Sequence, residues 1–269
     1  MMTKIQIVAT DLDGTLLNSH LELTDKNKQA LRRLKQSGVH VVLCTGRPFN
    51  GMAHLIDEIG LDDSDYTISY NGSLVQTCDG QEILHRANLS TSDFKCISDF
   101  FGQYGLGVHA MTMTKMFTYN KTIHPLTVRE AYLGNLDLTV LQAEEEVPDN
   151  IIKLMAVGDP WQLDQAINDF SHAFGEAYSL NKSEAFYLEI MQKGDNKARA
   201  LQILLEKLRL SSDNLMAFGN NNNDLDMIRL AKIGVAVDNA SASLKRESDY
   251  VTESNDNDGV AVFLEHYCA

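Results

Sequence analysis

Short apolar runs that end abruptly in polar loops recur in the first and last parts of the chain. The first run covers residues 5–10 and is followed at once by Asp11 and Asp13. A continuous apolar run of this length is typical of a strand buried on both faces of a parallel sheet. Further runs of this kind lie at 39–44, 66–69 and 215–218. We therefore expect a doubly wound, mostly parallel, Rossmann-like α/β sheet.

Helical patterns separate these runs. Thr24 is a good N-cap for a helix that has an apolar stripe and ends at Gly38. Asp195 is expected to cap a later helix, whose stripe contains Leu201, Leu204, Leu205 and Leu208. Alternation of helices and apolar strands on both sides of the middle segment supports the α/β assignment.

The middle of the chain has a different order of predicted helices and strands. Between about residues 84 and 187, short strands and helices follow one another without the regular α/β alternation. We expect an inserted α+β cap domain at 84–187, which interrupts a core domain formed by 1–83 and 188–269. A strand at 151–157 should then belong to the insert rather than to the sheet of residues 5–10.

Charge and composition exclude some partners. The 269 residues carry a formal net charge of −14, and no basic stripe is present for nucleic acid or an anionic membrane. Hydrophobic residues make up 44% of the chain, enough for a sizeable core. Cys44, Cys78, Cys96 and Cys268 lack zinc or CxxC spacing, which favours free thiols in a reducing compartment. No run approaches the roughly 20 apolar residues of a membrane span, so we expect a cytoplasmic protein.

The segment Asp11-Leu12-Asp13-Gly14-Thr15 places two carboxylates directly after the first strand. Ligands of open α/β sheets bind beyond the carboxyl ends of the strands. One such acid can attack phosphorus while the other handles the proton of the leaving group, and both can supply oxygen ligands for Mg²⁺. An ordinary Asp-Gly turn is the simpler alternative, but the apolar lead-in and the complete string favour a site.

Three other polar segments can join this pair if the strands are parallel. Thr45, with Gly46 and Arg47, follows the second apolar run, Lys197 opens a helix after the insert, and 219–224 follows the run at 215–218. Taken singly, each has an ordinary explanation as a turn, a solvated lysine or a loop. Their order along the chain predicts a phosphate site.

These motifs resemble those of the haloacid dehalogenase-like hydrolases, in particular the Cof-type branch with a type IIB cap. The resemblance covers essentially the whole chain, with its motifs at 11–17, 45–48, 70–72, Lys197, 223–227 and 234–240. It implies that Asp11 is the nucleophile and that Asp13 protonates the leaving group. It further implies that Thr45, Gly46, Arg47, Asn71, Lys197 and Asn223 bind the phosphoryl group or the substrate, and that Asp11, Asp13, Asn220 and Asp224 form the metal site.

The chain departs from the family pattern at Asn220 and Ala198. Asn220 stands where an aspartate is usual, so the site keeps an oxygen ligand but loses a charge. Asp224 can ligate through water or can fix a neighbouring lysine. Ala198 follows Lys197 where glycine is usual, and Lys193 is a competing lysine one helical turn earlier.

The resemblance implies a Mg²⁺-dependent phosphatase that hydrolyses sugar phosphates through an aspartyl-phosphate. Two alternatives stay open: a phosphotransferase or phosphomutase, and a low-activity protein that binds phosphorylated metabolites, which Asn220 supports. His124 and Lys182 of the insert are candidates for contact with the sugar, although each is also an ordinary surface residue type. The pattern names neither the sugar nor the oligomeric state.

Overall fold

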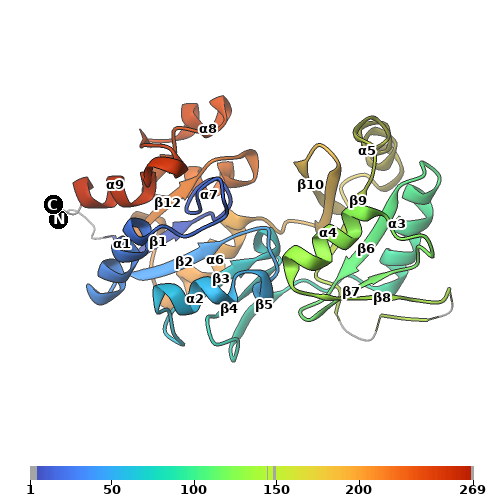
Figure 1. Cartoon of the computed structure of the whole chain (residues 1–269), viewed down its shortest axis with the longest axis horizontal. Helices are drawn as coiled ribbons and strands as arrows, with labels where there is room; N and C mark the ends of the chain where they lie inside the picture. The colour runs from blue at the N-terminus through green and yellow to red at the C-terminus, as the bar shows by residue number, and fades with distance from the viewer. Residues whose placement is uncertain (1–4, 144, 148–149, 268–269) are drawn as a thin grey trace. The chain divides into compact units, whose positions relative to one another are not determined.

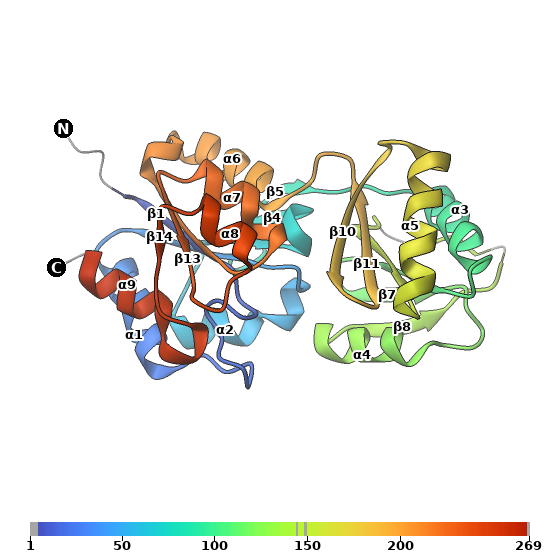
Figure 2. The same ribbon diagram turned by 90° about the horizontal axis from the view of Figure 1, so that it is seen from above.

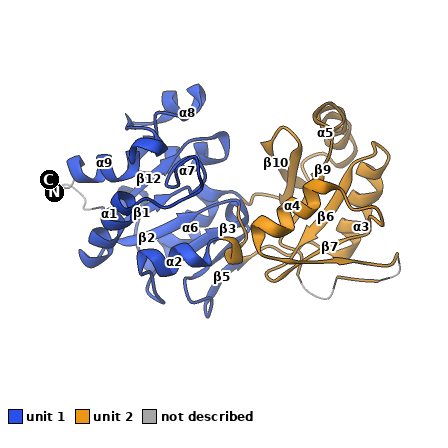
Figure 3. Ribbon diagram, viewed as in Figure 1, with its two compact units in different colours: residues 1–46, 52–85, 196–269 blue, residues 47–51, 86–195 orange. Residues whose placement is uncertain are grey.

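The computed structural model describes residues 5–143, 145–147 and 150–267 (Figure 1). The chain divides into two compact units (Figure 3). The first contains residues 1–46, 52–85 and 196–269, and the second contains residues 47–51 and 86–195. The second boundary of the insert lies at 195/196 rather than at the 187/188 expected from the sequence, because the strand Tyr187–Gln192 pairs within the sheet of the second unit.

An eight-stranded sheet forms the centre of the first unit. Its strand order is β14-β13-β12-β1-β2-β3-β4-β5. Neighbours from β14 to β3 run parallel, and β3 and β4 pair antiparallel. The bounds are β1 Ile7–Thr10, β2 His40–Cys44, β3 Tyr66–Ser69, β4 Leu74–Thr77, β5 Ile83–Arg86, β12 Leu215–Gly219, β13 Ile233–Ala236 and β14 Tyr250–Val251. The mostly parallel sheet expected from the sequence is confirmed.

Helices cover both faces of this sheet, with α6, α7 and α8 on one side and α1, α2 and α9 on the other (Figure 2). Their bounds are α1 Asp25–Gln36, α2 Ala53–Ile59, α6 Lys197–Leu208, α7 Leu225–Leu230, α8 Ala242–Glu247 and α9 Gly259–Tyr267. Short 3-10 turns are η2 Tyr70–Gly72, η3 Ser212–Asn214, η4 Asn222–Asp224 and η5 Asn255–Asn257. The stripe of α6, with Leu201 and Leu204, packs on buried residues of β1, β2, β3 and β12.

Helix caps follow the sequence with one exception. The Thr24 hydroxyl accepts a hydrogen bond from the Asn27 amide at the start of α1, as expected. At α6, however, the N-cap is Asn196 and not Asp195, because the Asn196 side chain accepts the hydrogen bond from the Arg199 amide. Both residue types favour this position, and the helix begins one residue later than the expectation.

The second unit is an α+β unit around a six-stranded sheet of order β10-β11-β9-β6-β7-β8. The strands are β6 Gly107–Met111, β7 Lys115–Thr118, β8 Asp137–Val140, β9 Lys153–Val157, β10 Tyr178–Glu184 and β11 Tyr187–Gln192. Its helices are α3 Thr91–Gly102, α4 Pro125–Gly134 and α5 Pro160–Phe174, and η1 Phe49–Gly51 also belongs to this unit. Phe94, Phe101 and Phe170 of α3 and α5 build an aromatic core against the sheet.

Cys44, Cys78 and Cys96 are free thiols, and Cys268 lies outside the described residues. Among the helices that the structure describes, none has the length and apolar character that a membrane crossing requires. The buried thiols of Cys44 and Cys78 have pKa values raised by burial. They are therefore protonated and unreactive at neutral pH.

Candidate active site

The predicted site residues of the first unit gather beyond the carboxyl ends of β1, β2 and β12. Asp11 follows β1 directly, and its amide donates to the Phe218 carbonyl of β12 at 3.0 Å. The parallel pairing of β1 with both β2 and β12 sets the three strand ends side by side. The strand-end loops therefore meet at the sheet edge where ligands of such folds bind.

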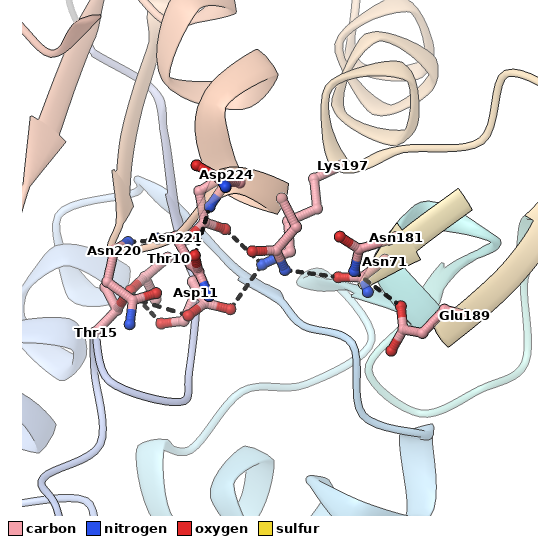
Figure 4. Close-up of polar contacts among 12 residues, drawn as sticks. Thr10, Asp11, Thr15, Asn71, Asn181, Glu189, Lys197, Asn220, Asn221 and Asp224 are labelled. Carbon is pink, nitrogen blue, oxygen red and sulfur yellow. Dashed lines mark hydrogen bonds and ion pairs between the residues drawn. The ribbon is translucent and has the colours of Figure 1, made fainter. Parts of the chain in front are cut away.

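Lys197, the first residue of α6, lies between two carboxylates (Figure 4). Its Nζ is 2.6 Å from Asp11 Oδ1 and 2.7 Å from Asp224 Oδ1. The lysine is 1% exposed. Burial alone would lower the pKa of Lys197, but Asp11 and Asp224 outweigh it and hold that pKa above its ordinary value. The charged ammonium group is thus fixed beside the proposed nucleophile.

Burial raises the pKa of Asp11 to about 7, Lys197 opposes the rise, and Asp224 and Asp13 add to it. Three carboxylates therefore act on one another around a single lysine. Thr15 Oγ1 donates to Asp11 Oδ2 at 3.2 Å, and Thr10 Oγ1 donates to the Asp11 carbonyl at 2.8 Å. Sequence reasoning assigned no role to these two threonines, although Thr15 belongs to the same motif. They orient the Asp11 carboxylate and its backbone.

Asp224 organises the loop after β12. Its Oδ2 accepts hydrogen bonds from the backbone amides of Asn220 at 2.9 Å and Asn221 at 3.0 Å. A Cβ at Gly219 would lie 2.5 Å from the Asp224 Cβ, so only glycine allows this approach. Both carboxylate oxygens of Asp224 are therefore engaged within the protein. Of its two sequence-based roles, ligation of a metal through water and fixing of a neighbouring lysine, the contacts favour the second.

Asn71 links two of the loops. Its backbone amide donates a hydrogen bond to the Thr45 carbonyl at 2.9 Å. Its side-chain Oδ1 accepts a hydrogen bond from Asn223 Nδ2 at 3.0 Å. A Cβ at Gly46 would lie 3.0 Å from Asn71 Nδ2, so Gly46 also belongs to this contact. Thr45 is 1% exposed and Asn71 is 3% exposed. The structure thus brings Thr45, Gly46, Asn71 and Asn223 together in the first unit.

The backbone around Asn71 is strained. Tyr70, Asn71 and Gly72 have consecutive φ values of 52°, 55° and 104°, and residues held in this region cluster at functional sites. A Cβ at Gly72 would lie 2.2 Å from the carbonyl oxygen of Asn196. Gly72 therefore does more than permit a turn: it lets the turn pack against the backbone that precedes Lys197.

The remaining predicted residues belong to the second unit. Arg47 belongs to the second unit, where its Nη1 donates to the Gly51 carbonyl at 3.3 Å. The competing Lys193 pairs with Glu176 at 3.4 Å on an exposed surface of that unit. His124 caps α4 through its Nδ1, and Lys182 pairs with Asp164. Lys197 is thus the lysine that contacts Asp11.

The residues near Asp11 suit a hard divalent cation. Asp11, the Asp13 carbonyl and the Asn220 amide offer oxygen atoms, which Mg²⁺ prefers. Asp13 and Asp224 both add to the rise of the Asp11 pKa that burial causes and Lys197 opposes, and a cation beside Asp11 would counter all three effects. Within the described residues, no group of three or more His, Cys, Asp or Glu side chains is arranged to hold a metal. A cation here would therefore rely on backbone and amide oxygens beside Asp11.

Comparison with known proteins places the chain in a family. The family model of the haloacid dehalogenase-like hydrolases matches residues 8–264. The chain therefore belongs to the haloacid dehalogenase-like hydrolase family. A Streptococcus pyogenes protein named "Putative phosphatase" is 36% identical over 96% of each chain. The Bacillus subtilis 5-amino-6-(5-phospho-D-ribitylamino)uracil phosphatase YcsE is 28% identical over 98% of this chain and 96% of its own length.

A solved structure shows the same fold. The crystal structure of a haloacid dehalogenase-like hydrolase from Bacteroides thetaiotaomicron superimposes with a TM-score of 0.87 at 28% identity. The match covers 98% of this chain and 100% of that one. The inserted α+β unit is thus part of the shared architecture.

Proposed function

We propose that this protein is a phosphatase that hydrolyses phosphate monoesters, with Asp11 as the nucleophile. The observation that carries the proposal is the buried Lys197, which bridges Asp11 and Asp224 at 2.6 and 2.7 Å. A phosphate monoester is dianionic and is repelled by a carboxylate unless fixed positive charge compensates. Membership of the hydrolase family and the names of the relatives support the same reaction.

The first half-reaction transfers the phosphoryl group to the protein. A carboxylate oxygen of Asp11 attacks phosphorus in line, the bond to the substrate oxygen breaks, and protonated Asp13 gives its proton to the departing alcohol. Asp13 is exposed, whereas Asp11 is 5% exposed. This difference suits an outer acid that meets the leaving group and an inner nucleophile that bulk water does not reach.

The second half-reaction restores the enzyme. Water attacks the phosphorus of the aspartyl-phosphate and gives a proton to Asp13, and the bond between phosphorus and Asp11 breaks. Lys197, Thr45 and the strand-end amides hold the phosphoryl oxygens throughout. Asp11, the Asp13 carbonyl and Asn220 would hold Mg²⁺, which would supply further charge neutralisation. Asp224 acts chiefly by positioning Lys197 and the amides of the 219–224 loop.

The substrate class that we propose is sugar phosphates. The motifs also resemble those of the sugar phosphatase YidA, and YcsE acts on a phosphorylated ribityl compound by its name. The second unit, residues 47–51 and 86–195, is proposed to contribute recognition of the leaving group. Arg47, with Asn71 and Asn223 of the first unit, is proposed to contact the substrate.

A phosphate-release screen tests this function. The substrates are hexose, pentose and sugar-alcohol phosphates and the phosphorylated ribitylaminouracil, each with and without added Mg²⁺. We expect phosphate release that requires Mg²⁺ and is lost in Asp11→Asn. Isomer formation without net phosphate release would favour a phosphomutase. Thermal stabilisation by the same compounds without turnover would favour a binding protein, the alternative that Asn220 supports.

A further inference from the structure

The segment 239–243, which follows β13 in the first unit, contacts both loops that carry the proposed metal ligands. It begins within the 234–240 motif, to which the proposed mechanism assigns no role. β13 pairs parallel with β12, and β12 pairs parallel with β1. The segment therefore leaves the sheet at the same edge as the loops 11–15 and 219–224. To reach the loop after β1, it passes the end of β12, which lies between β13 and β1.

Asn239 holds the turn that follows Asp13. Its Nδ2 donates to the Gly14 carbonyl at 2.7 Å, and its Oδ1 accepts from the backbone amide of Asn255 at 3.0 Å. Asn255 is 5% exposed, and its own Nδ2 donates to the Leu17 carbonyl at 3.0 Å. Because one end of a side-chain amide only donates and the other only accepts, these partners fix the orientation of the Asn239 side chain.

Core packing does not explain this contact, because Asn239 is exposed. A hydrogen bond at the surface replaces one to water and adds little to stability. What the contact restricts is the backbone at Gly14, which has a φ of 74° and no side chain to limit its rotation. The peptide before Gly14 contains the Asp13 carbonyl, a proposed ligand. A fixed Gly14 carbonyl therefore limits how the Asp13 carbonyl can turn.

The same segment holds the loop of Asn220. The Ser241 amide donates to the Asn220 carbonyl at 2.9 Å, and Ser243 Oγ donates to Asn222 Oδ1 at 3.0 Å. A Cβ at Gly14 would lie 2.3 Å from Asn220 Nδ2, so the two loops touch beside the proposed ligands. Three hydrogen bonds from one short segment thus tie together two loops that leave different strands.

We propose that residues 239–243 form a clamp that holds the Asp13 carbonyl and the Asn220 side chain in place to bind one Mg²⁺, with Asn239 as the positioning residue. The inference rests on the proposed phosphatase function and deepens it. Mg²⁺ requires near-ideal octahedral geometry, and these two ligands come from the ends of β1 and β12. Because Asn220 lacks the charge of an aspartate, the site gains less from attraction and depends more on ligands that are already in place.

The test measures metal binding to the full-length protein without substrate. Mn²⁺ is the probe, because oxygen ligands suit both ions and the electron paramagnetic resonance signal of free Mn²⁺ falls as the ion binds. Only binding that is lost in Asp11→Asn, which removes a proposed ligand, is assigned to this site. Asn239→Ala should raise the Kd for Mn²⁺ about tenfold or more, because the loss of a group that orients a metal ligand typically has an effect of this size.

Ser19→Ala is the matched control. It removes the hydroxyl bond to Asp256 at 2.7 Å, another exposed contact between the loop after β1 and the C-terminal part of the chain. Because that bond does not hold a peptide next to a proposed ligand, the Kd should change by less than about twofold. A contact that served stability alone would lower the urea midpoint in both variants and leave both Kd values unchanged.

Phosphate release gives a second readout. In Asn239→Ala the Mg²⁺ concentration for half-maximal activity should rise about tenfold, while kcat at saturating Mg²⁺ should stay within about twofold. This split is expected of a residue that supports the metal site and does not take part in the chemical step. A fall in kcat that added Mg²⁺ does not restore would contradict the clamp.

The outcomes separate this inference from the proposed function. An unchanged Kd in Asn239→Ala, an equal rise in Ser19→Ala, or a wild type that binds no Mn²⁺ at millimolar concentrations would overturn the clamp, and the phosphate-release screen would still decide the function. A wild type that binds Mn²⁺ but releases no phosphate in that screen would overturn the function, and the Kd comparison would still decide whether the segment supports a metal site. If Asn239→Ala does not fold, as judged by circular dichroism, Ser243→Ala decides, because it removes the bond to Asn222 and should raise the same Kd.

Discussion

The two units place their polar chemistry in different parts of a sheet. In the first unit, Asp11, Thr45 and the 219–224 loop lie beyond strand ends, and the strands themselves are buried on both faces. In the second unit, His109, Lys153 and Glu189 lie within strands, on the face opposite the aromatic core. A parallel sheet covered on both faces leaves only its edge for a ligand, whereas a sheet with one apolar face leaves the other face for polar groups.

Substitution of Asp11, at the strand ends of the first unit, should have the largest effect on turnover. Asp11→Asn should abolish turnover with every substrate, because an amide is a poor nucleophile. The fold should persist, since the change removes a buried charge rather than adding one. Phosphate release and circular dichroism are measured together. Near-normal phosphate release by the Asp11→Asn protein would show that the nucleophile is another residue and does not lie at the end of β1.

Removal of the lysine charge should have the next largest effect. Lys197→Met leaves Asp11 and Asp224 buried without their partner, which typically costs about 3–5 kcal/mol of stability. Turnover should fall about a hundredfold or more, because the phosphoryl group loses a fixed positive charge. Denaturant unfolding and steady-state kinetics report the two effects. Lys193→Met is the control, and a loss of similar size there would contradict the assignment of Lys197.

Replacement of the Asn220 side-chain amide by a carboxylate should have a moderate effect on the Mg²⁺ requirement. Asn220→Asp restores a charged oxygen ligand and should lower the Mg²⁺ concentration for half-maximal activity several-fold, roughly as a further anionic ligand strengthens Mg²⁺ binding. A Mg²⁺ titration of phosphate release measures this. An unchanged or higher requirement would show that position 220 does not hold the ion and that another group, such as Asp224, takes its place.

The smallest effect at neutral pH concerns His109, whose substitution should change stability only under acidic conditions. The unfolded chain binds a proton at this residue below about pH 6.5, while the folded protein does not until about pH 3. Stability should therefore fall as the pH falls through this window, by up to about 1.4 kcal/mol per pH unit from His109 alone. His109→Gln should remove this part of the slope in urea unfolding at a series of pH values. Identical slopes in both proteins would show that the pKa of His109 is the same in the folded and unfolded states.

The sequence predicts the first unit well and the second unit only in outline. The strand Tyr66–Ser69 was expected at these residues, and the apolar runs located β1, β2 and β12 to within two residues. The strand-end loops can be recognised in the sequence because the residues of each motif are close together along the chain. The contact between Glu189 and Asn181 in the second unit cannot be recognised in this way. These residues meet only through antiparallel pairing, and no local sequence pattern specifies that register.

The features that the sequence places wrongly, or does not show, have similar physical causes. Asp195 and Asn196 are both good N-caps, and the structure uses Asn196, whose backbone carbonyl packs against Gly72. The boundary expected at 187/188 fell on β11, whose residues are nearly all buried and resemble a strand of either sheet. Thr15 was read as part of a motif, but its bond to Asp11 depends on the turn that Gly14 permits at φ 74°. Each of these features depends on contacts between segments distant in sequence or on turn geometry.

Detection of the covalent intermediate tests the central claim most directly. Asp13→Asn should slow hydrolysis of the aspartyl-phosphate, because the group that accepts the proton of water is lost. Rapid acid quench during turnover of this variant, followed by peptide mass spectrometry, should show one phosphoryl group on the peptide that contains Asp11. The double variant with Asp11→Asn should show none. Turnover without any phosphorylated protein, or a phosphoryl group on another residue, would contradict the assignment of Asp11 as the nucleophile.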